Sequence, residues 1–197
     1  MPPVDVPFSC TCGRVHGIVR SVAPNRGNHV RCYCRSCQTA ANVLGYESAL
    51  DDFGGTSVFQ TMPSRVDYEA GLENLACFRL SPKGLLRWYA SCCNAPLVTM
   101  PDASWFPIAG LNLERVKQSD HTAFGPIIAV HQSACAQDAP ADLNDFGLKR
   151  AGIKMFGRAF KARLRRDAMA PYFDRAGKIS VSPRILTLEE RRAAEPD

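Results

Sequence analysis

Short stretches of alternating apolar and polar residues dominate the first two thirds of the chain. Residues 8–23 alternate loosely around valine and isoleucine, and residues 75–80 and 85–89 are two more such stretches, joined by Ser81-Pro82-Lys83-Gly84. A period of two with β-branched residues is typical of strands, and a four-residue loop with Pro and Gly is typical of a hairpin. Residues 41–46 are a further short strand candidate. Proline and glycine recur throughout this region, which disfavours long helices.

The pattern changes near residue 144. Apolar residues there follow one another at spacings of three and four, as on one face of a helix: Ile153, Phe156, Phe160 and Leu164. This spacing predicts an amphipathic helix over 152–166, ended by Pro171, and Lys or Arg fills much of its remaining surface. We expect the apolar face to pack against the β region and the charges to be solvated. The sequence therefore predicts a mainly β domain over 8–143 and a basic C-terminal extension over 144–197.

Composition is that of an ordinary globular protein, with 46% hydrophobic and 22% charged residues among 197. No apolar run is long enough to span a membrane, and the start of the chain lacks the pattern of a signal peptide. We therefore expect a cytoplasmic protein with no membrane partner, in a compartment where thiols stay reduced. The sequence leaves the oligomeric state open.

The net charge of +5 belongs entirely to the C-terminal quarter. Residues 151–197 hold eleven basic and six acidic residues, whereas the first 150 residues hold thirteen of each. A basic helix of this kind can contact nucleic-acid phosphates or a protein partner. It lacks the aromatic-basic interleaving of single-strand binding platforms, which makes nucleic acid the less favoured partner.

Nine cysteines in a reduced compartment indicate metal ligation or thiol chemistry. Cys77 and Cys135 stand alone, and Cys77 has the apolar neighbours of a small buried hydrophobe. The four histidines are scattered, as structural histidines usually are. The other seven cysteines form three groups: Cys10 and Cys12; Cys32, Cys34 and Cys37; and Cys92 and Cys93.

Zinc is the metal that these groups favour. Four thiolates close a tetrahedral structural site, whereas three protein ligands leave the open position of a catalytic site. The C-x-C-x-x-C group of Cys32, Cys34 and Cys37 suits the open site. Cys10 and Cys12 with cysteines from 92–93 suit the closed one. An iron–sulfur cluster is the alternative for the triple group, and two half-buried strand cysteines are the alternative for Cys10 and Cys12.

These motifs resemble those of the glutathione-dependent formaldehyde-activating enzyme and centromere protein V family. That family has C-x-C-G on an early strand, C-x-C-x-x-C about twenty residues later, and then aromatic-C-x-x-C-G-x-x-L. The corresponding residues are Cys10 to Gly13, Cys32 to Cys37, and Tyr89 to Leu97. The resemblance covers roughly residues 8–113, and the extension after 143 lies outside the family pattern.

The resemblance implies a fold of several small antiparallel sheets of zinc-ribbon-like (β-tent) character. It also implies a structural zinc on Cys10, Cys12 and Cys93 and a substrate-side zinc on Cys32, Cys34 and Cys37. This chain departs from the family at Ala90, where the family has a cysteine, and at Asn94, where it has a glycine. Cys92 is the candidate to supply the missing sulfur; otherwise the site has three ligands, a water or no metal.

The resemblance further implies carbon–sulfur lyase chemistry, in which a small thiol such as glutathione and a small aldehyde form or release an S-hydroxymethyl adduct. Cys32, Cys34 and Cys37 would then be the catalytic cysteines. Arg35, beside the cluster, is the candidate contact for an anionic group of the thiol. The alternative is a non-catalytic zinc module that binds a thiol or, through its basic helix, a protein or nucleic-acid partner.

Overall fold

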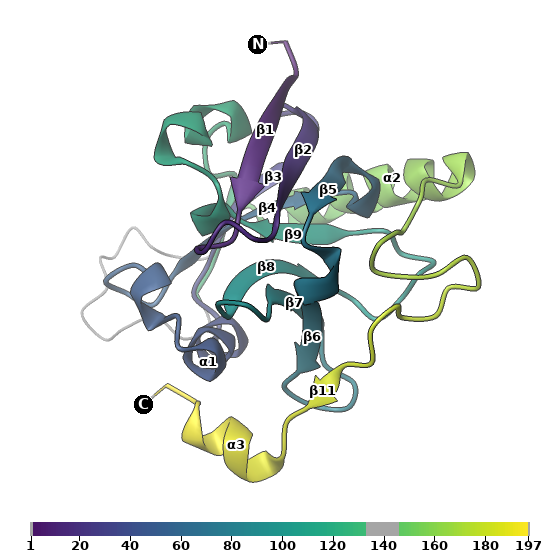
Figure 1. Cartoon of the computed structure of the whole chain (residues 1–197). Helices are drawn as coiled ribbons and strands as arrows, with labels where there is room; N and C mark the ends of the chain where they lie inside the picture. The colour runs from purple at the N-terminus through teal and green to yellow at the C-terminus, as the bar shows by residue number, and fades with distance from the viewer. Residues whose placement is uncertain (1, 133–145, 197) are drawn as a thin grey trace.

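The computed structural model describes residues 2–132 and 146–196 and shows a mainly β protein with two sheets (Figure 1). The smaller sheet is antiparallel in the order β1-β2-β5. Its strands are β1 (Val4–Ser9), β2 (His16–Val22) and β5 (Val66–Ala70).

The larger sheet has eight strands in the order β10-β3-β4-β9-β8-β7-β6-β11. Its two edge strands, β10 and β11, run parallel to their neighbours, and the other pairs are antiparallel. The mainly β prediction is confirmed. Several small antiparallel sheets were expected, whereas the structure has one small antiparallel sheet and one large mixed sheet. The strands are β3 (Asn28–Cys32), β4 (Thr56–Thr61), β6 (Leu75–Arg79), β7 (Leu86–Ala90), β8 (Ala95–Met100), β9 (Ala109–Asn112), β10 (Ala129–His131) and β11 (Arg184–Ile185).

The core lies where the two sheets meet. Phe8 of β1 and Val19 of β2 are buried in the same cluster as Trp88 of β7 and Leu111 of β9. The predicted hairpin is confirmed, because β6 and β7 pair antiparallel with Leu75 opposite Ala90. Its second strand leads directly to the cysteine pair at 92–93, so the core positions that loop.

The helix α1 (Arg35–Leu44), drawn in Figure 1, begins directly after Cys34 and contains Cys37. The strand predicted over 41–46 is wrong, because those residues form the end of α1 and the turn after it. Ala40, Ala41 and Leu44 recur at helical spacing on the buried side, and Gly45 ends the helix with a left-handed φ of 67°. Residues 41–46 alone were too short a window to separate this pattern from a strand.

The predicted C-terminal helix is present as α2 (Leu148–Arg165), but its orientation is the reverse of the one expected. The predicted stripe of Ile153, Phe156, Phe160 and Leu164 is 63–74% exposed, whereas Ala151, Met155, Ala159 and Ala162 are buried. These mostly small side chains let the helix backbone approach the sheet, and the Asn28 side chain donates a 2.9 Å hydrogen bond to the Ala151 carbonyl. Packing on the β region thus uses the alanine face of α2.

Residues after α2 return to the β region. Tyr172 is fully buried in the main core, β11 extends the large sheet, and α3 (Leu188–Ala193) lies near α1 (Figure 1). Asn42 of α1 donates a 2.9 Å hydrogen bond to the carbonyl of Ala194. Within the described residues, no helix has the length and apolar character needed to cross a membrane. Five short 3-10 helices complete the described elements: Glu47–Ala49, Pro63–Arg65, Leu72–Asn74, Leu113–Arg115 and Gln118–Phe124.

Candidate metal centres

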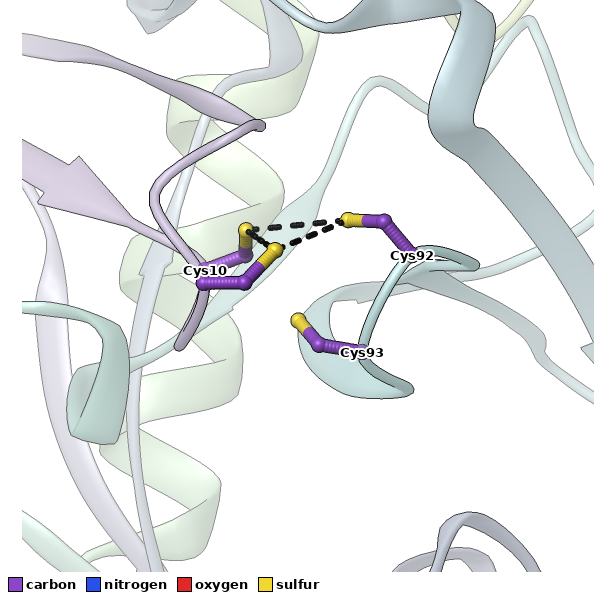
Figure 2. A group of neighbouring side chains, drawn as sticks. Cys10, Cys92 and Cys93 are labelled. Atoms are coloured by element: carbon purple, nitrogen blue, oxygen red, sulfur yellow. Dashed lines mark hydrogen bonds between the residues drawn. The ribbon is translucent and has the colours of Figure 1, made fainter.

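The first candidate metal centre consists of four cysteines from two loops. The sulfurs of Cys10, Cys12, Cys92 and Cys93 all lie within 4.8 Å of one another, and the Cys10 sulfur is 3.6 Å from that of Cys12 and 3.9 Å from that of Cys92. In Figure 2 the side chains of Cys10, Cys92 and Cys93 converge from opposite sides on one point. A tetrahedral zinc with four thiolates separates its sulfurs by about 3.8 Å. The four cysteines therefore fit a closed zinc site.

Tight turns aim both loops at this point. After β1, the Gly13 amide donates to the Cys10 carbonyl at 3.1 Å and Gly13 takes a left-handed φ of 80°. Between β7 and β8, the Cys93 amide donates to the Ala90 carbonyl at 3.2 Å, and Asn94 takes a left-handed φ of 58°. Asparagine tolerates this conformation better than most residues, which explains how it stands where the resembling family has glycine.

The departure at Ala90 does not leave the cluster short of sulfur. Ala90 ends β7 and is fully buried in the core, while both Cys92 and Cys93 reach the cluster from the loop that follows. Their adjacency in sequence therefore does not prevent both sulfurs from lying with Cys10 and Cys12.

The environment of this centre shifts the pKa values of Cys12 and Cys92 in opposite directions. The backbone N–H of Arg14 and then the thiol of Cys92 stabilise the Cys12 thiolate and lower the pKa of Cys12 to about 7. Burial, followed by the neighbouring Cys12 and Cys10, raises the pKa of Cys92 to about 12. Without a cation, the loops thus favour the thiolate of Cys12 over that of Cys92, and a bound divalent metal would favour deprotonation of both.

The second candidate metal centre lies where β3 leads into α1. Cys32 ends β3, Cys34 precedes the helix and Cys37 is in its first turn, and their three sulfurs lie within 4.8 Å of one another. The Cys37 amide donates to the Cys34 carbonyl at 2.9 Å, so the helical turn itself sets the spacing. Among the described residues, no histidine or carboxylate joins these three as a fourth ligand. The donor set fits a zinc site with one open position.

The approach of β3 to this centre is held by an ion pair. Arg31, which precedes Cys32, lies 2.5 Å from Asp51, and the Tyr33 hydroxyl donates to the same carboxylate at 3.1 Å. Asp51 also accepts a 2.8 Å hydrogen bond from the Gly55 amide. Residues on both sides of Cys32 are therefore fixed to one loop.

Arg87 is a site residue that sequence reasoning missed. Its side chain is only 6% exposed and donates a 2.6 Å hydrogen bond to the Ser36 hydroxyl, between Cys34 and Cys37. Hydrogen bonds from Cys32 and Cys34, with the Arg87 guanidinium adding to them, hold the pKa of Cys37 well below its usual range. The available signal was a lone cation in the apolar strand of 85–90.

A cavity of about 500 Å³ adjoins the second centre. Cys32 and Cys37 are part of its wall, with α1 on one side and strands of the large sheet on the other. Most of the wall is apolar, Arg87 is its only Lys or Arg, and no acidic side chain lines it within the described parts of the chain. Representative wall residues are Val30, Leu44, Val58, Val98, Met100 and Ile108.

Arg35, the predicted anion contact, does not line this cavity. Its side chain is 58% exposed and its guanidinium lies 3.9 Å from the carboxylate of Glu195. Arg35 is the first residue of α1, and its side chain points to Glu195 in the C-terminal segment instead of into the cavity. Arg87 is the cation that lines the cavity instead, and an anion contact at Arg35 stays a prediction.

Tyr46 connects the two centres. Its ring is part of the cavity wall beside the second centre, while its hydroxyl is hydrogen-bonded to Thr11, between Cys10 and Cys12. The Arg115 guanidinium stacks 5.1 Å from the centre of the Tyr46 ring and donates to Thr11 at 2.8 Å. The loop of the first centre thereby positions one side of the cavity.

The remaining cysteines and histidines of the sequence do not join either centre within the described residues. Cys77 is buried in the core, and burial raises its pKa to about 12, as expected of a structural thiol. His16, His29 and His121 contact the backbone carbonyls of Gly13, Gly125 and Leu113. Cys135 lies outside the described residues.

A protein-family model described as "Family of unknown function (DUF6151)" matches residues 3–152. The chain belongs to the DUF6151 family. The matched residues of this DUF6151 member contain both cysteine clusters and the cavity wall, and the match ends inside α2. No curated protein matches the chain. Among solved structures, a crystal structure of a Rhodobacter sphaeroides protein is similar, with a TM-score of 0.42 and 16% identity over 61% of this chain and 96% of that one.

Proposed function

We propose that the protein binds two zinc ions and uses the second centre to form or cleave a carbon–sulfur bond between a small thiol and a small aldehyde. The observation that carries this proposal is the three-cysteine group opening on a cavity of about 500 Å³, with a buried arginine beside it. The same chain has a group of four cysteines that suits a structural zinc, so this group of three need not serve that role.

We further propose that the chain is a divergent relative of the glutathione-dependent formaldehyde-activating enzyme and centromere protein V family. Support comes from the order and spacing of the cysteines and from their convergence in three dimensions into one group of four and one of three. The C-terminal extension, with α2, β11 and α3, is this chain's own addition to the pattern.

In the forward reaction, the thiol sulfur attacks the aldehyde carbon. A carbon–sulfur bond forms, the carbonyl π bond breaks, and the proton lost by the thiol ends on the new hydroxyl oxygen, which balances the S-hydroxymethyl product. A zinc ion held by Cys32, Cys34 and Cys37 would lower the pKa of an incoming thiol and polarise a carbonyl oxygen.

The protein's own residues would orient the reactants. Cys32 and Cys37 place the metal ligands at the cavity wall, and Arg87 offers a guanidinium for a carboxylate or a developing oxyanion. The apolar walls contributed by Leu44, Val58 and Met100 would limit the access of water, which competes with the thiol for the aldehyde carbon.

The cavity wall also bears on which thiol is bound. Glutathione carries two carboxylates and one ammonium group, and the described wall offers Arg87 as its one Lys or Arg and no acidic side chain. Glutathione could place one carboxylate at Arg87, but its ammonium group would find no charged partner. We therefore propose glutathione and a small apolar thiol, such as propanethiol, as the two thiols to compare.

The test measures adduct formation from formaldehyde and each thiol by zinc-loaded protein. Catalysis predicts a rate above the uncatalysed one that Cys34→Ser abolishes, with Cys77→Ala as the matched control that keeps it. Equal rates for wild type, Cys34→Ser and buffer would refute the lyase. In that case, measured zinc content and thiol binding by calorimetry would support the alternative, a non-catalytic zinc module. The weak Lewis acidity of a zinc ion with three thiolate ligands favours this alternative.

A further inference from the structure

The outer face of α2 carries a continuous apolar patch, which we define as Trp105, Phe106, Ile153, Phe156, Phe160 and Leu164. The four helix residues are 63–74% exposed and Trp105 is 65% exposed. Large apolar side chains that gather on a surface in this way mark an interaction site, whereas single exposed ones need no explanation.

Ring contacts join the helix to the loop before β9. The ring centres of Phe106 and Phe156 lie 4.8 Å apart, and those of Trp105 and Phe106 lie 5.5 Å apart. The apolar stripe on α2 therefore extends into an aromatic cluster supplied by a second element. The inner, alanine-rich face of α2 already packs on the protein, so the stripe is not needed to hold the helix in place.

The charge on α2 has a single sign. Its 18 residues include seven Lys or Arg and no Asp or Glu, and Arg166 follows directly. Lys154, Lys161 and Arg165 are exposed and, at 100° per residue, lie along one side of the apolar stripe. The face thus combines large apolar side chains with a flanking row of cations.

Three kinds of occupant make different use of these features. Nucleic acid would pair with the cations but leave Ile153, Phe156 and Phe160 in water. A second copy of this chain, docked symmetrically, would cover the stripe but bring two basic helices together without an acidic partner on either. An anionic lipid surface accepts both, because headgroups pair with Lys and Arg while the stripe enters the boundary with the acyl chains.

We propose that this face docks on a membrane surface rich in anionic lipid, with α2 lying in the plane of the interface and Trp105 at headgroup depth. This goes beyond the proposed chemistry at the cysteines and does not depend on it. It also departs from the expectation of no membrane partner, since lying on a membrane requires no spanning segment.

The two tryptophans of the chain make a direct experiment. Trp88 is 1% exposed in the core, so a change in fluorescence on adding vesicles reports on Trp105. With the zinc-loaded full chain, we expect vesicles of phosphatidylcholine and phosphatidylglycerol to shift the emission to the blue and to co-sediment the protein. Phosphatidylcholine alone should bind much less, added salt should weaken binding, and Trp105→Phe should remove the blue shift.

Substitution then separates the possible occupants. Phe156→Ser combined with Phe160→Ser should weaken vesicle binding about tenfold or more, since two apolar side chains no longer leave water. The matched control is Leu188→Ser on α3, an apolar residue 61% exposed outside the patch, which should bind as wild type does. All three positions are exposed, so the variants should keep the wild-type melting temperature.

Three results would overturn the proposal. The first is equal vesicle binding by the double variant and wild type. The second is a dimer in light scattering that the double variant converts to monomer, which would assign the patch to a second copy. The third is binding of duplex DNA, unaffected by the double variant, in a protein that ignores anionic vesicles.

Discussion

The two cysteine clusters are built from the same side chain and differ in everything around it. The first draws its four sulfurs from two turns far apart in sequence, each ended by a left-handed residue, and offers a complete set of four ligands. The second draws three sulfurs from one strand-to-helix junction and faces a cavity. Under the proposed function, the number of chain segments that meet at a cluster, more than the ligand type, distinguishes a structural centre from one that is available for chemistry.

The largest expected effect comes from losing a sulfur of the first centre. Cys93→Ser should destabilise the protein by about 4–5 kcal/mol, because a metal that ties two turns together is lost. Cys34→Ser should cost far less stability, since the second centre joins residues that are already neighbours on one turn of chain. Thermal unfolding with zinc content per chain measures both. Similar melting temperatures for the two variants would contradict the division of roles.

The next effect concerns the buried arginine of the second centre. Arg87→Met keeps the apolar stem but removes the guanidinium from Ser36 and Cys37, so we expect zinc affinity at this centre to fall about 10–100-fold. Competition with a chromophoric chelator measures that affinity. Arg79→Met is the matched control, because Arg79 is also buried, on the adjacent strand, and is paired with Asp102 instead. It should lower stability and leave zinc affinity unchanged.

A smaller effect is expected at the turn that carries Cys92 and Cys93. Asn94 has a φ of 58°, so Asn94→Ala should destabilise the folded protein by about 1–2 kcal/mol. Asn94→Gly should be neutral or stabilising, because glycine takes this conformation without steric conflict. Urea unfolding of the two variants checks the difference. If both lost equal stability, the left-handed turn would not be what matters there.

The smallest effect is a pH dependence at the loop that holds β3. Burial raises the pKa of Asp51, but hydrogen bonds from the Gly55 amide and the Arg31 guanidinium outweigh it, and the net pKa is below 3.8. A carboxyl with a lower pKa in the folded state stabilises the protein above its unfolded pKa, and that contribution is lost as pH falls through the folded value. Asp51→Asn should lower the free energy of unfolding by about 1 kcal/mol near neutral pH. The difference between wild type and variant should disappear in acid. Parallel acid unfolding curves would contradict this.

Local patterns predicted much of this molecule from sequence. The hairpin of β6 and β7 rests on residues within one short segment, and the spacing within Cys32 to Cys37 already places three sulfurs on one turn. Features that depend on distant segments were harder to predict from the residues alone. Arg87 meets Ser36 only because the fold brings β7 beside α1. The motifs did predict that Cys10 and Cys12 join the cysteines of 92–93, and the convergence of two loops brings these four together.

The error over α2 has a different cause. Periodicity identified the helix from Ile153, Phe156 and Phe160, and this most hydrophobic stripe was predicted to pack on the β region. The helix has a second, less hydrophobic face of alanine and Met155, and close approach to Asn28 and the sheet selected that one. Hydrophobicity alone does not say which of two apolar faces is covered when the smaller residues pack more closely.

The hydrogen bond between Tyr46 and Thr11 joins the cavity wall to the loop of the first centre. A metal bound at the first centre would fix the loop that carries Thr11. Thr11 would then hold Tyr46 in its place in the cavity wall before any ligand binds. Linkage is reciprocal, so a molecule that favours this position of Tyr46 in the cavity must also tighten metal retention at the first centre. Occupancy of the cavity would then be readable in the rate at which a chelator strips zinc from the other centre.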